Sequence, residues 1–331
     1  MVGRPSRHGG LPGGPLGGRV QARIVVIGAG GLGSYVGALL AKVGHHVTLV
    51  ARGEHLAAIR RHGLHVKTVA GDFQVHPAAV GSALELSGAD LSYVTVKAYS
   101  LEDVADQVEH LARAGAVVVP LLNGVTASEQ LVEHGVAHDR ILDGIAYMTA
   151  FRTAPGRIER RAAHHRVVVG SSTGAGKAAI RLVADTFDGT GVEIVASEDI
   201  ASDLWTKMAV VCALSVLCGL TGQSMGPVRT HRFGADLQER AIAEVTAVAR
   251  ARGIALPQDA EKTIGAALDA FPADFFPSVI HDLRSGRRTE MEELGGAIVR
   301  MAREAGIEAP LHEAATCAIQ LAEPESVSVA T

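Results

Sequence analysis

The pattern of hydrophobic positions changes character near residue 197. Before that point, short apolar runs alternate with amphipathic stretches. Residues 24–27 form an uninterrupted apolar run typical of a buried strand, and residues 47–51 are predicted to form the next strand. Between them, apolar residues recur at helical spacing: Val36, Leu39, Leu40 and Val43. This stretch therefore predicts a strand–helix–strand unit.

The same alternation continues further along the first half. Apolar runs at 91–96 and 116–120 flank a helical pattern at 101–111. Later strands are predicted at 166–170 and 192–195. Strands that alternate with helices in this way favour an α/β fold with a parallel, doubly wound sheet.

Beyond residue 197 the periodic segments all have helical spacing. They cover residues 203–220, 237–251, 260–268, 291–302 and 311–321. The chain is thus predicted to be a Rossmann-type α/β domain followed by an all-α domain. A length of 331 residues agrees with two domains.

The predicted boundaries follow these changes of pattern. We expect a Gly/Pro-rich tail at 1–20, an α/β domain at 21–196, a helical domain at 197–323 and a short tail at 324–331. The first 20 residues lack the apolar core of a secretory signal. The apolar run 208–220 is shorter than the roughly 20 residues that cross a bilayer, which favours a buried helix over a membrane span.

Charge and cysteine content exclude several classes of function. The net charge is −4 and the basic residues are dispersed, which argues against a nucleic acid partner. The three cysteines show no CxxC spacing and cannot all pair, so we expect a reducing cytoplasm. The 15 histidines include the adjacent pairs 45–46 and 164–165, but neighbouring side chains diverge and no metal site is predicted.

The first candidate site is a glycine-rich loop between the first predicted strand and helix. It reads Gly28-Ala29-Gly30-Gly31-Leu32-Gly33 and fits the GxGxxG pattern of dinucleotide-binding folds. In that pattern Gly28 permits the tight turn, Gly30 lets the backbone approach a pyrophosphate, and Gly33 allows close packing of helix on strand. The helix that follows would offer free N–H groups to the phosphates.

The residue that selects between NAD and NADP is expected at the end of the second strand. Arg52 stands there, where NAD-binding proteins carry an acidic residue for the ribose 2′-hydroxyl. A guanidinium can pair with a 2′-phosphate, so we expect NADPH. Glu54, two residues later, is the feature that favours NAD instead.

Lys207 is conspicuous because no other charge occurs in the apolar run 208–220 that follows it. A lysine in that position either extends to solvent from the helix or faces a polar cleft. Periodicity alone slightly favours the first interpretation.

Several motifs together resemble the ketopantoate reductase (2-dehydropantoate 2-reductase) family from about residue 23 to residue 321. In the first half these are residues 47–56 with Arg52, the segment Val94-Thr95-Val96-Lys97-Ala98-Tyr99 and the loop Leu121-Leu122-Asn123-Gly124-Val125. In the second half they are Asp203-Leu204-Trp205-Thr206-Lys207-Met208-Ala209, residues 277–282 with Ser278, and Arg288-Thr289-Glu290.

The resemblance implies an NADPH-dependent reduction of a 2-keto acid, in which ketopantoate becomes pantoate for pantothenate synthesis. It implies that Lys207 is the general acid, that Glu290 supports it, and that Asn123 contacts both nicotinamide and substrate. Lys97 would line the cleft for cofactor and substrate, and Ser278 would bind substrate. The active site would lie in a cleft between the two domains of a cytoplasmic monomer or homodimer.

One departure from the family pattern affects the substrate. Relatives that act on ketopantoate usually carry asparagines four and eight residues after the lysine, and this chain has Val211 and Ser215 there. Ser215 could still form a hydrogen bond with substrate, whereas Val211 cannot. Two alternatives therefore stay open: a relative that reduces a different keto acid or ketone, and a non-catalytic NADPH-binding sensor.

Overall fold

The computed structural model describes residues 21–160, 165–172 and 174–324. The predicted tail at 1–20, most of the tail at 324–331 and His164 lie outside these ranges. The chain forms two compact units. The first comprises Met1–Leu122 and Thr126–Ile200, and the second comprises Asn123–Val125 and Ala201–Thr331.

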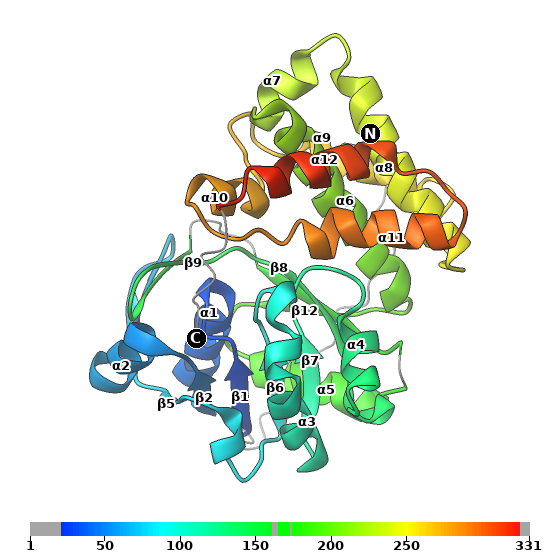
Figure 1. Cartoon of the computed structure of the whole chain (residues 1–331). Helices are drawn as coiled ribbons and strands as arrows, with labels where there is room; N and C mark the ends of the chain where they lie inside the picture. Colours follow the sequence, from blue (N-terminus) through cyan, green and yellow to red (C-terminus); the bar gives the residue numbers. More distant parts are fainter. Residues whose placement is uncertain (1–20, 161–164, 173, 325–331) are drawn as a thin grey trace, which may run out of the picture. The chain divides into compact units, whose positions relative to one another are not determined.

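The α/β unit is built on a five-stranded sheet in the order β5-β2-β1-β6-β7, in which every pair is parallel. Its strands run side by side in Figure 1: β5 (Ala78–Val80), β2 (His46–Val50), β1 (Arg23–Ile27), β6 (Leu91–Val94) and β7 (Val117–Pro120). The connecting helices include α1 (Gly31–Lys42), α2 (Gly53–His62) and α3 (Ala105–Arg113). The predicted Rossmann-type parallel sheet is confirmed.

The central strand β1 is apolar on both faces because helices cover both. Ile24 and Val26 belong to one core together with Tyr35 and Leu39 of α1. Val25 and Ile27 belong to a second core with Val108 and Leu111 of α3. Alternate residues of a strand point to opposite faces, so a continuous apolar run is what a sheet covered on both sides requires.

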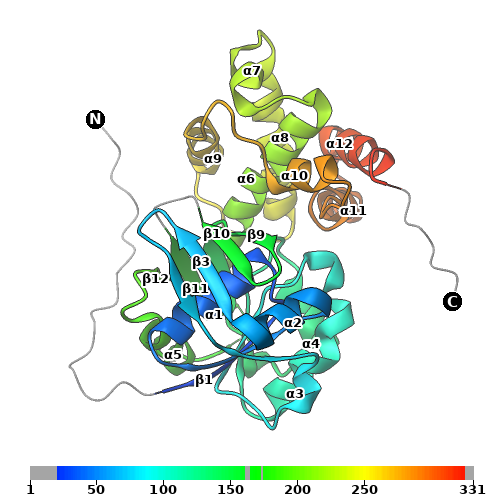
Figure 2. The same ribbon diagram turned by 90° about the vertical axis from the view of Figure 1, so that its left-hand side faces the viewer.

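Two further sheets complete this unit and contain antiparallel pairs that the sequence pattern did not resolve. One has the order β12-β11-β8 and the other β4-β3-β10-β9; β3, β10 and β9 lie together in Figure 2. The first comprises β8 (Asp143–Tyr147), β11 (Arg166–Gly170) and β12 (Glu193–Ala196); the second comprises β3 (Leu64–Thr68), β4 (Phe73–Val75), β9 (Phe151–Ala154) and β10 (Arg157–Arg160). The helices α4 (Ala127–Glu133) and α5 (Lys177–Phe187) also belong to this unit.

The second unit is helical in its described part, as predicted. Its elements are α6 (Ile200–Thr221), α7 (Met225–Thr230), α8 (Gly234–Ala251), α9 (Ala260–Asp269), α10 (Ser278–Arg284), a π-helical turn at Glu292–Gly296, α11 (Ala297–Glu304) and α12 (Pro310–Leu321). Apolar residues of α6 pack in one core with those of α8, α9, α11 and α12. The helix α6 is long and apolar enough to span a membrane, but 56% of its most apolar window is buried inside this structure.

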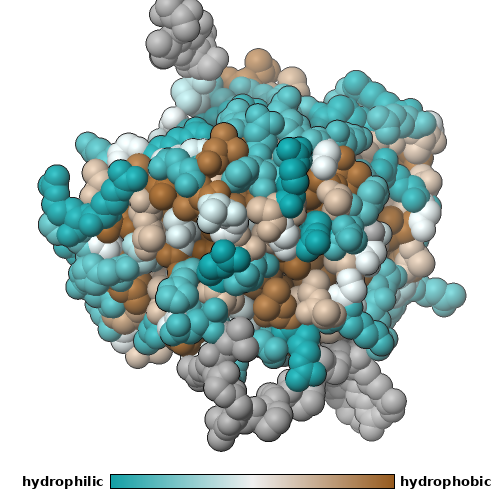
Figure 3. Space-filling view, turned by 90° about the horizontal axis from the view of Figure 1, so that it is seen from below, coloured by the Kyte–Doolittle hydropathy of each residue, from teal (hydrophilic) through white to brown (hydrophobic). Residues whose placement is uncertain are grey.

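Apolar side chains at the surface are dispersed. Those with large exposed areas include Val69, Leu84, Phe233 and Leu321, which lie far apart in the sequence. On the face seen in Figure 3, hydrophilic side chains separate the apolar ones. Isolated exposed apolar residues of this kind are ordinary on a folded protein.

Glu244 of α8 holds the beginning of α12 in place. Its carboxylate accepts hydrogen bonds from the backbone N–H groups of Leu311 (2.9 Å) and His312 (3.1 Å) and from His312 Nδ1 (2.6 Å). The first N–H groups of a helix have no partner within the helix, so this carboxylate satisfies them from a neighbouring element. These hydrogen bonds hold the pKa of Glu244 below its usual value, although burial acts in the opposite direction.

Replacement of Glu244 by alanine should therefore lower the free energy of unfolding by about 3 kcal/mol, because it leaves buried donors unpaired. Urea unfolding at pH 7 measures this loss. The control is Glu239→Ala on the same helix, where the side chain is exposed and a change within about 0.5 kcal/mol is expected. Equal losses in both variants would show that the contact does not stabilise α12.

Candidate functional site

The glycine loop joins β1 to α1 at the carboxyl edge of the parallel sheet, where dinucleotides bind in folds of this type. Gly28 has a positive φ of 97°, and a Cβ atom there would lie 2.7 Å from the Val96 nitrogen. A Cβ on Gly33 would collide with Thr95 Oγ1 and with the carbonyl oxygen of Gly28. These two glycines are therefore required by the packing of the protein itself.

Gly30 differs from its neighbours, because no atom of the protein lies within 4 Å of the position that its Cβ would occupy. Its φ of −72° is one that any residue can adopt. Gly30 is the residue before α1, and no side chain caps that helix. Open space above a helix N-terminus fits a ligand whose phosphates approach the backbone closely.

The remaining loop residues are fixed by contacts with the protein. A Cβ on Gly31 would collide with the Ala150 carbonyl oxygen, and Leu32 packs against the apolar core. The Ala29 N–H donates to the Val50 carbonyl at 3.1 Å, which joins the loop to the end of β2. Arg52 follows two residues later, exposed, as the residue before α2. A guanidinium at this end of β2 fits a 2′-phosphate.

Thr95 and Lys97 follow β6, the neighbour of β1 in the sheet. Thr95 Oγ1 donates to the carbonyl oxygens of Gly28 (2.8 Å) and Ile27 (3.1 Å) and so fixes the first turn of the loop. Lys97 is partly buried two residues further on. The sequence did not predict this role of Thr95, because nothing in the pattern distinguishes it from other threonines at strand ends.

Lys207 lies within α6 and is partly buried. Loss of hydration on burial lowers the pKa of this amine to about 8, and the negative charge of Glu290 acts in the opposite direction. Glu290 itself is only 3% exposed. The structure therefore brings together, in one electrostatic pair, two residues that are far apart in the sequence.

The backbone next to Glu290 is held by the end of the helical unit. Glu323 accepts hydrogen bonds from the Thr289 N–H (3.1 Å) and from Thr289 Oγ1 (2.5 Å). Thr289 Oγ1 also accepts from the Met291 N–H at 3.1 Å. Residues on both sides of Glu290 are thus fixed, which limits the positions that its carboxylate can take.

Asn123 belongs to the helical unit although it follows a strand of the α/β unit. The turn at Gly124 has a φ of 105°, and a Cβ there would lie 3.8 Å from the Glu293 carbonyl oxygen. Val125 packs against the helical core. This short loop therefore places Asn123 on the same unit as Lys207 and Glu290.

The other expected substrate contacts have different surroundings. Ser278 is exposed at the first residue of α10, and Val211 is partly buried against the helical core. Ser215 is fully buried, and its hydroxyl donates to the Val211 carbonyl at 2.9 Å. In this structure the hydroxyl proton of Ser215 is used within α6, so only the acceptor lone pairs of this hydroxyl are left for a substrate.

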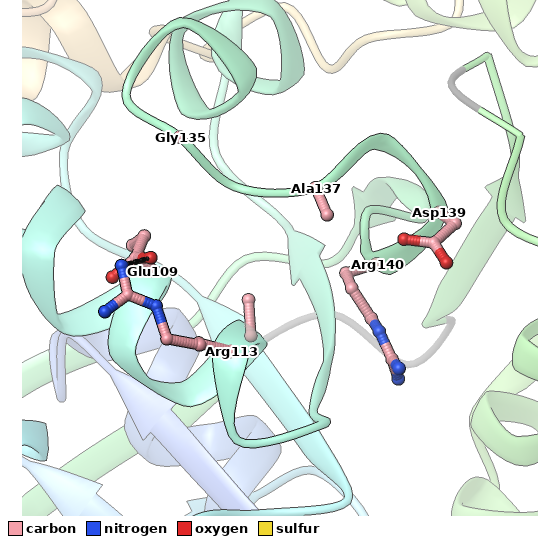
Figure 4. Close-up of a pocket in the computed structure, with 7 residues that line it drawn as sticks. Glu109, Arg113, Gly135, Ala137, Asp139 and Arg140 are labelled. Atoms are coloured by element: carbon pink, nitrogen blue, oxygen red, sulfur yellow. Dashed lines mark hydrogen bonds and ion pairs between the residues drawn. The ribbon is translucent and has the colours of Figure 1, made fainter.

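A separate cavity of about 350 Å³ lies in the α/β unit (Figure 4). It is lined by the end of α3, which precedes β7, and by residues 135–140, which precede β8. Glu109 and Arg113 pair with each other there. This cavity adjoins the amino ends of strands, whereas the glycine loop follows a carboxyl end, so it is not the dinucleotide site.

Comparison with known proteins gives the family. Residues 24–174 match the model of ketopantoate reductase PanE/ApbA, and residues 199–323 match the model of its C-terminal domain. The chain belongs to the ketopantoate reductase family, as its motifs indicated, and is an oxidoreductase that depends on NAD or NADP.

Individual relatives are more varied. A 2-dehydropantoate 2-reductase of Halobacterium salinarum is 32% identical, over 91% of this chain and 99% of its own. An uncharacterized oxidoreductase of Bacillus subtilis, YkpB, is 27% identical over 92% of this chain and 99% of its own. Among solved structures, D-mandelate dehydrogenase with NADH and anilino(oxo)acetate has a TM-score of 0.82 at 25% identity, over 90% of this chain and 98% of its own.

Two glycine variants separate the requirements of the fold from those of the ligand. Gly30→Ala should leave the free energy of unfolding within about 0.5 kcal/mol of wild type, because its Cβ meets no protein atom. It should nevertheless weaken NADP⁺ binding at least about tenfold, or about 1.4 kcal/mol.

Gly33→Ala should instead cost about 2 kcal/mol of stability, because its Cβ meets backbone that cannot yield. Urea unfolding and calorimetric titration measure the two effects, and unchanged NADP⁺ affinity in Gly30→Ala would contradict the assignment.

Proposed function

We propose that this protein reduces a 2-keto acid to a 2-hydroxy acid with NADPH, and that the substrate is ketopantoate, which becomes pantoate for pantothenate and coenzyme A synthesis. The observation that carries the proposal is the pair formed by Lys207 and Glu290 on the same unit as Asn123. The dinucleotide loop with its unfilled space at Gly30 supports the redox part of the reaction. Kinship with named 2-dehydropantoate 2-reductases supports the choice of substrate.

The choice of NADPH rests on Arg52. Its exposed guanidinium stands at the end of β2, where it can form charge-assisted hydrogen bonds to a 2′-phosphate. Glu54 is also exposed, within the first turn of α2, and is the residue that would favour NAD. NADH is therefore the nucleotide to compare, as the structural neighbour with bound NADH also suggests.

The proposed chemistry divides between the nucleotide and the protein. NADPH supplies the hydride that the substrate carbonyl carbon receives, and the protein must supply a proton to the oxygen. Lys207 is the proposed donor. A pKa of about 8 keeps its ammonium form predominant at pH 7 while making the proton easier to release than from an ordinary lysine. Glu290 stabilises that ammonium and keeps it oriented.

Other residues position the substrate in this proposal. Asn123 would donate a hydrogen bond to the carbonyl, and Ser278 would bind the carboxylate or a hydroxyl. Lys97 would line the cleft on the nucleotide side. Orientation of this kind supplies a large part of the rate of such reactions. We further propose that the protein acts in the cytoplasm as a monomer or homodimer, without nucleic acid or membrane partners.

A second substrate class is favoured by Val211. This side chain offers no hydrogen bond at a position where ketopantoate-reducing relatives usually have an asparagine, and Ser215 does not replace it. An apolar contact there suits a keto acid with a less hydroxylated side chain. A structural neighbour named D-mandelate dehydrogenase shows that the fold accommodates a different 2-hydroxy acid. A non-catalytic NADPH sensor is the third candidate.

A substrate panel tests these alternatives directly. NADPH and NADH oxidation would be followed with ketopantoate, phenylglyoxylate and aliphatic 2-keto acids. We expect turnover with NADPH and the highest kcat/KM with ketopantoate. A preference for phenylglyoxylate or another keto acid would select the second candidate, and tight NADPH binding without turnover would select the sensor.

The pH profile tests Lys207. Because the ammonium form is the proton donor, kcat/KM for reduction should fall as the pH rises through about 8. Lys207→Ala should lower kcat/KM at least about 100-fold and remove this inflection. Lys262→Ala changes an exposed lysine of the same unit and should leave both unchanged. A loss below about tenfold in Lys207→Ala would reject the general-acid role.

A further inference from the structure

His55 is a buried polar side chain that joins three elements of the α/β unit. It lies in the first turns of α2 and is only 4% exposed. Its Nδ1 accepts a hydrogen bond from the Gly156 N–H at 3.0 Å, in the turn between β9 and β10. Its Nε2 lies 3.1 Å from Oγ of Ser34 in α1.

The directions of these hydrogen bonds follow from the backbone donor. An N–H group can only donate, so Nδ1 of His55 carries no proton and Nε2 carries the one proton of the neutral ring. Nε2–H therefore donates to Ser34 Oγ, and the Ser34 hydroxyl in turn donates to the Ala29 carbonyl at 3.0 Å. Each hydroxyl and ring proton in this chain has one acceptor. The chain begins at Gly156 and ends within the glycine loop.

The protonation state of His55 agrees with this arrangement. The pKa of the imidazole is lowered to about 4, mainly by burial and also by the positive charge of Arg152 on β9. The hydrogen bond toward the Ala29 carbonyl acts in the opposite direction and raises this pKa. The ring is therefore neutral at pH 7. A second proton on Nδ1 would face the Gly156 N–H, which is also a donor.

The position of His55 in the sequence connects it to both parts of the nucleotide site. It lies three residues after Arg52, and the Leu56 N–H donates to the Arg52 carbonyl at 3.3 Å. At its other end the chain of hydrogen bonds holds Ala29, the second residue of the glycine loop. The ring of His55 thus lies between the glycine loop and the first turn of the helix that follows Arg52.

We propose that His55 is a positioning residue for nucleotide binding, which acts through Ser34 on the glycine loop and through α2 on Arg52. The proposal rests on the proposed dinucleotide site. A purely structural His55 would stabilise the fold without changing affinity, so nucleotide affinity and stability must be measured separately.

The chain offers a matched control in His45. Its Nδ1 accepts from the Ala22 N–H at 3.2 Å, and its Nε2 lies 2.9 Å from the Thr186 carbonyl oxygen. Like His55, His45 forms hydrogen bonds through both Nδ1 and Nε2, and here both partners are backbone groups. It differs in lying just after α1 ends, whereas the glycine loop precedes that helix.

Substitutions at His55 can retain one half of the ring's hydrogen bonding at a time. Asparagine places its amide near Nδ1 and keeps a partner for Gly156, whereas glutamine reaches the position of Nε2 and can still donate to Ser34. NADP⁺ affinity would be measured by calorimetric titration for wild type, His55→Asn, His55→Gln, Ser34→Ala and His45→Asn. Urea unfolding of each variant would give its stability.

We expect His55→Asn and Ser34→Ala to weaken NADP⁺ binding about 3- to 10-fold, the equivalent of one hydrogen bond. His55→Gln should stay within about twofold of wild type, and so should His45→Asn, even where stability falls in both. Wild-type affinity in His55→Asn, or an equal loss in His45→Asn, would overturn the proposal. A wild-type protein that binds neither NADP⁺ nor NAD⁺ would overturn the proposed function as well, which distinguishes the two failures.

Discussion

The electrostatic pair of Lys207 and Glu290 is the constraint on which the proposed chemistry depends. A helix as apolar as α6 can form the centre of a core, but an amine within it loses hydration, and its pKa falls to about 8. A buried carboxylate opposite the amine offsets that loss, and breaking such a pair leaves an unpaired buried charge. The hydrogen bonds from Thr289 to Glu323 fix the backbone next to Glu290 and so limit the positions of the Glu290 carboxylate. Stability and proposed chemistry therefore depend on the same contact.

The α/β unit meets a different constraint, which is close packing around a turn. Parallel strands bring their carboxyl ends to one edge of the sheet, so the glycine loop, Arg52 and Lys97 are delivered there by three adjacent strands. The Thr95 hydroxyl occupies the space that a side chain on Gly33 would need. In this loop, only Gly30 has no protein atom nearby that would exclude a side chain. That contrast is stronger evidence for a ligand than the match to the GxGxxG pattern alone.

Membership of the ketopantoate reductase family defines the class of reaction more firmly than the substrate. The proposed chemistry needs a nucleotide loop, a lysine and a glutamate, and this chain has all three. Residues that recognise the rest of the substrate are under different constraints, and here α6 presents Val211 and turns the Ser215 hydroxyl back onto its own backbone. The family therefore covers more than one 2-hydroxy acid, as its structural neighbours illustrate.

The sequence by itself determined the local elements and the class of protein, because both depend on patterns between residues that are close in sequence. Apolar periodicity located four of the five strands of the parallel sheet, all except β5, and the long helices of the second unit. The motifs around Gly28, Asn123 and Lys207 indicated the family. Short strands such as β3, β4 and β9 and the helix α2 were missed. β3 pairs with the distant strand β10, and β4 and β9 are only three and four residues long, which is too short for a clear alternation of apolar and polar residues. Tertiary structure alone decided that Ser215 is buried with its hydroxyl on the Val211 carbonyl and that Glu290 lies within electrostatic range of Lys207. It also joined His55 to Ala29 through Ser34, because burial and hydrogen-bond partners depend on which distant elements pack together.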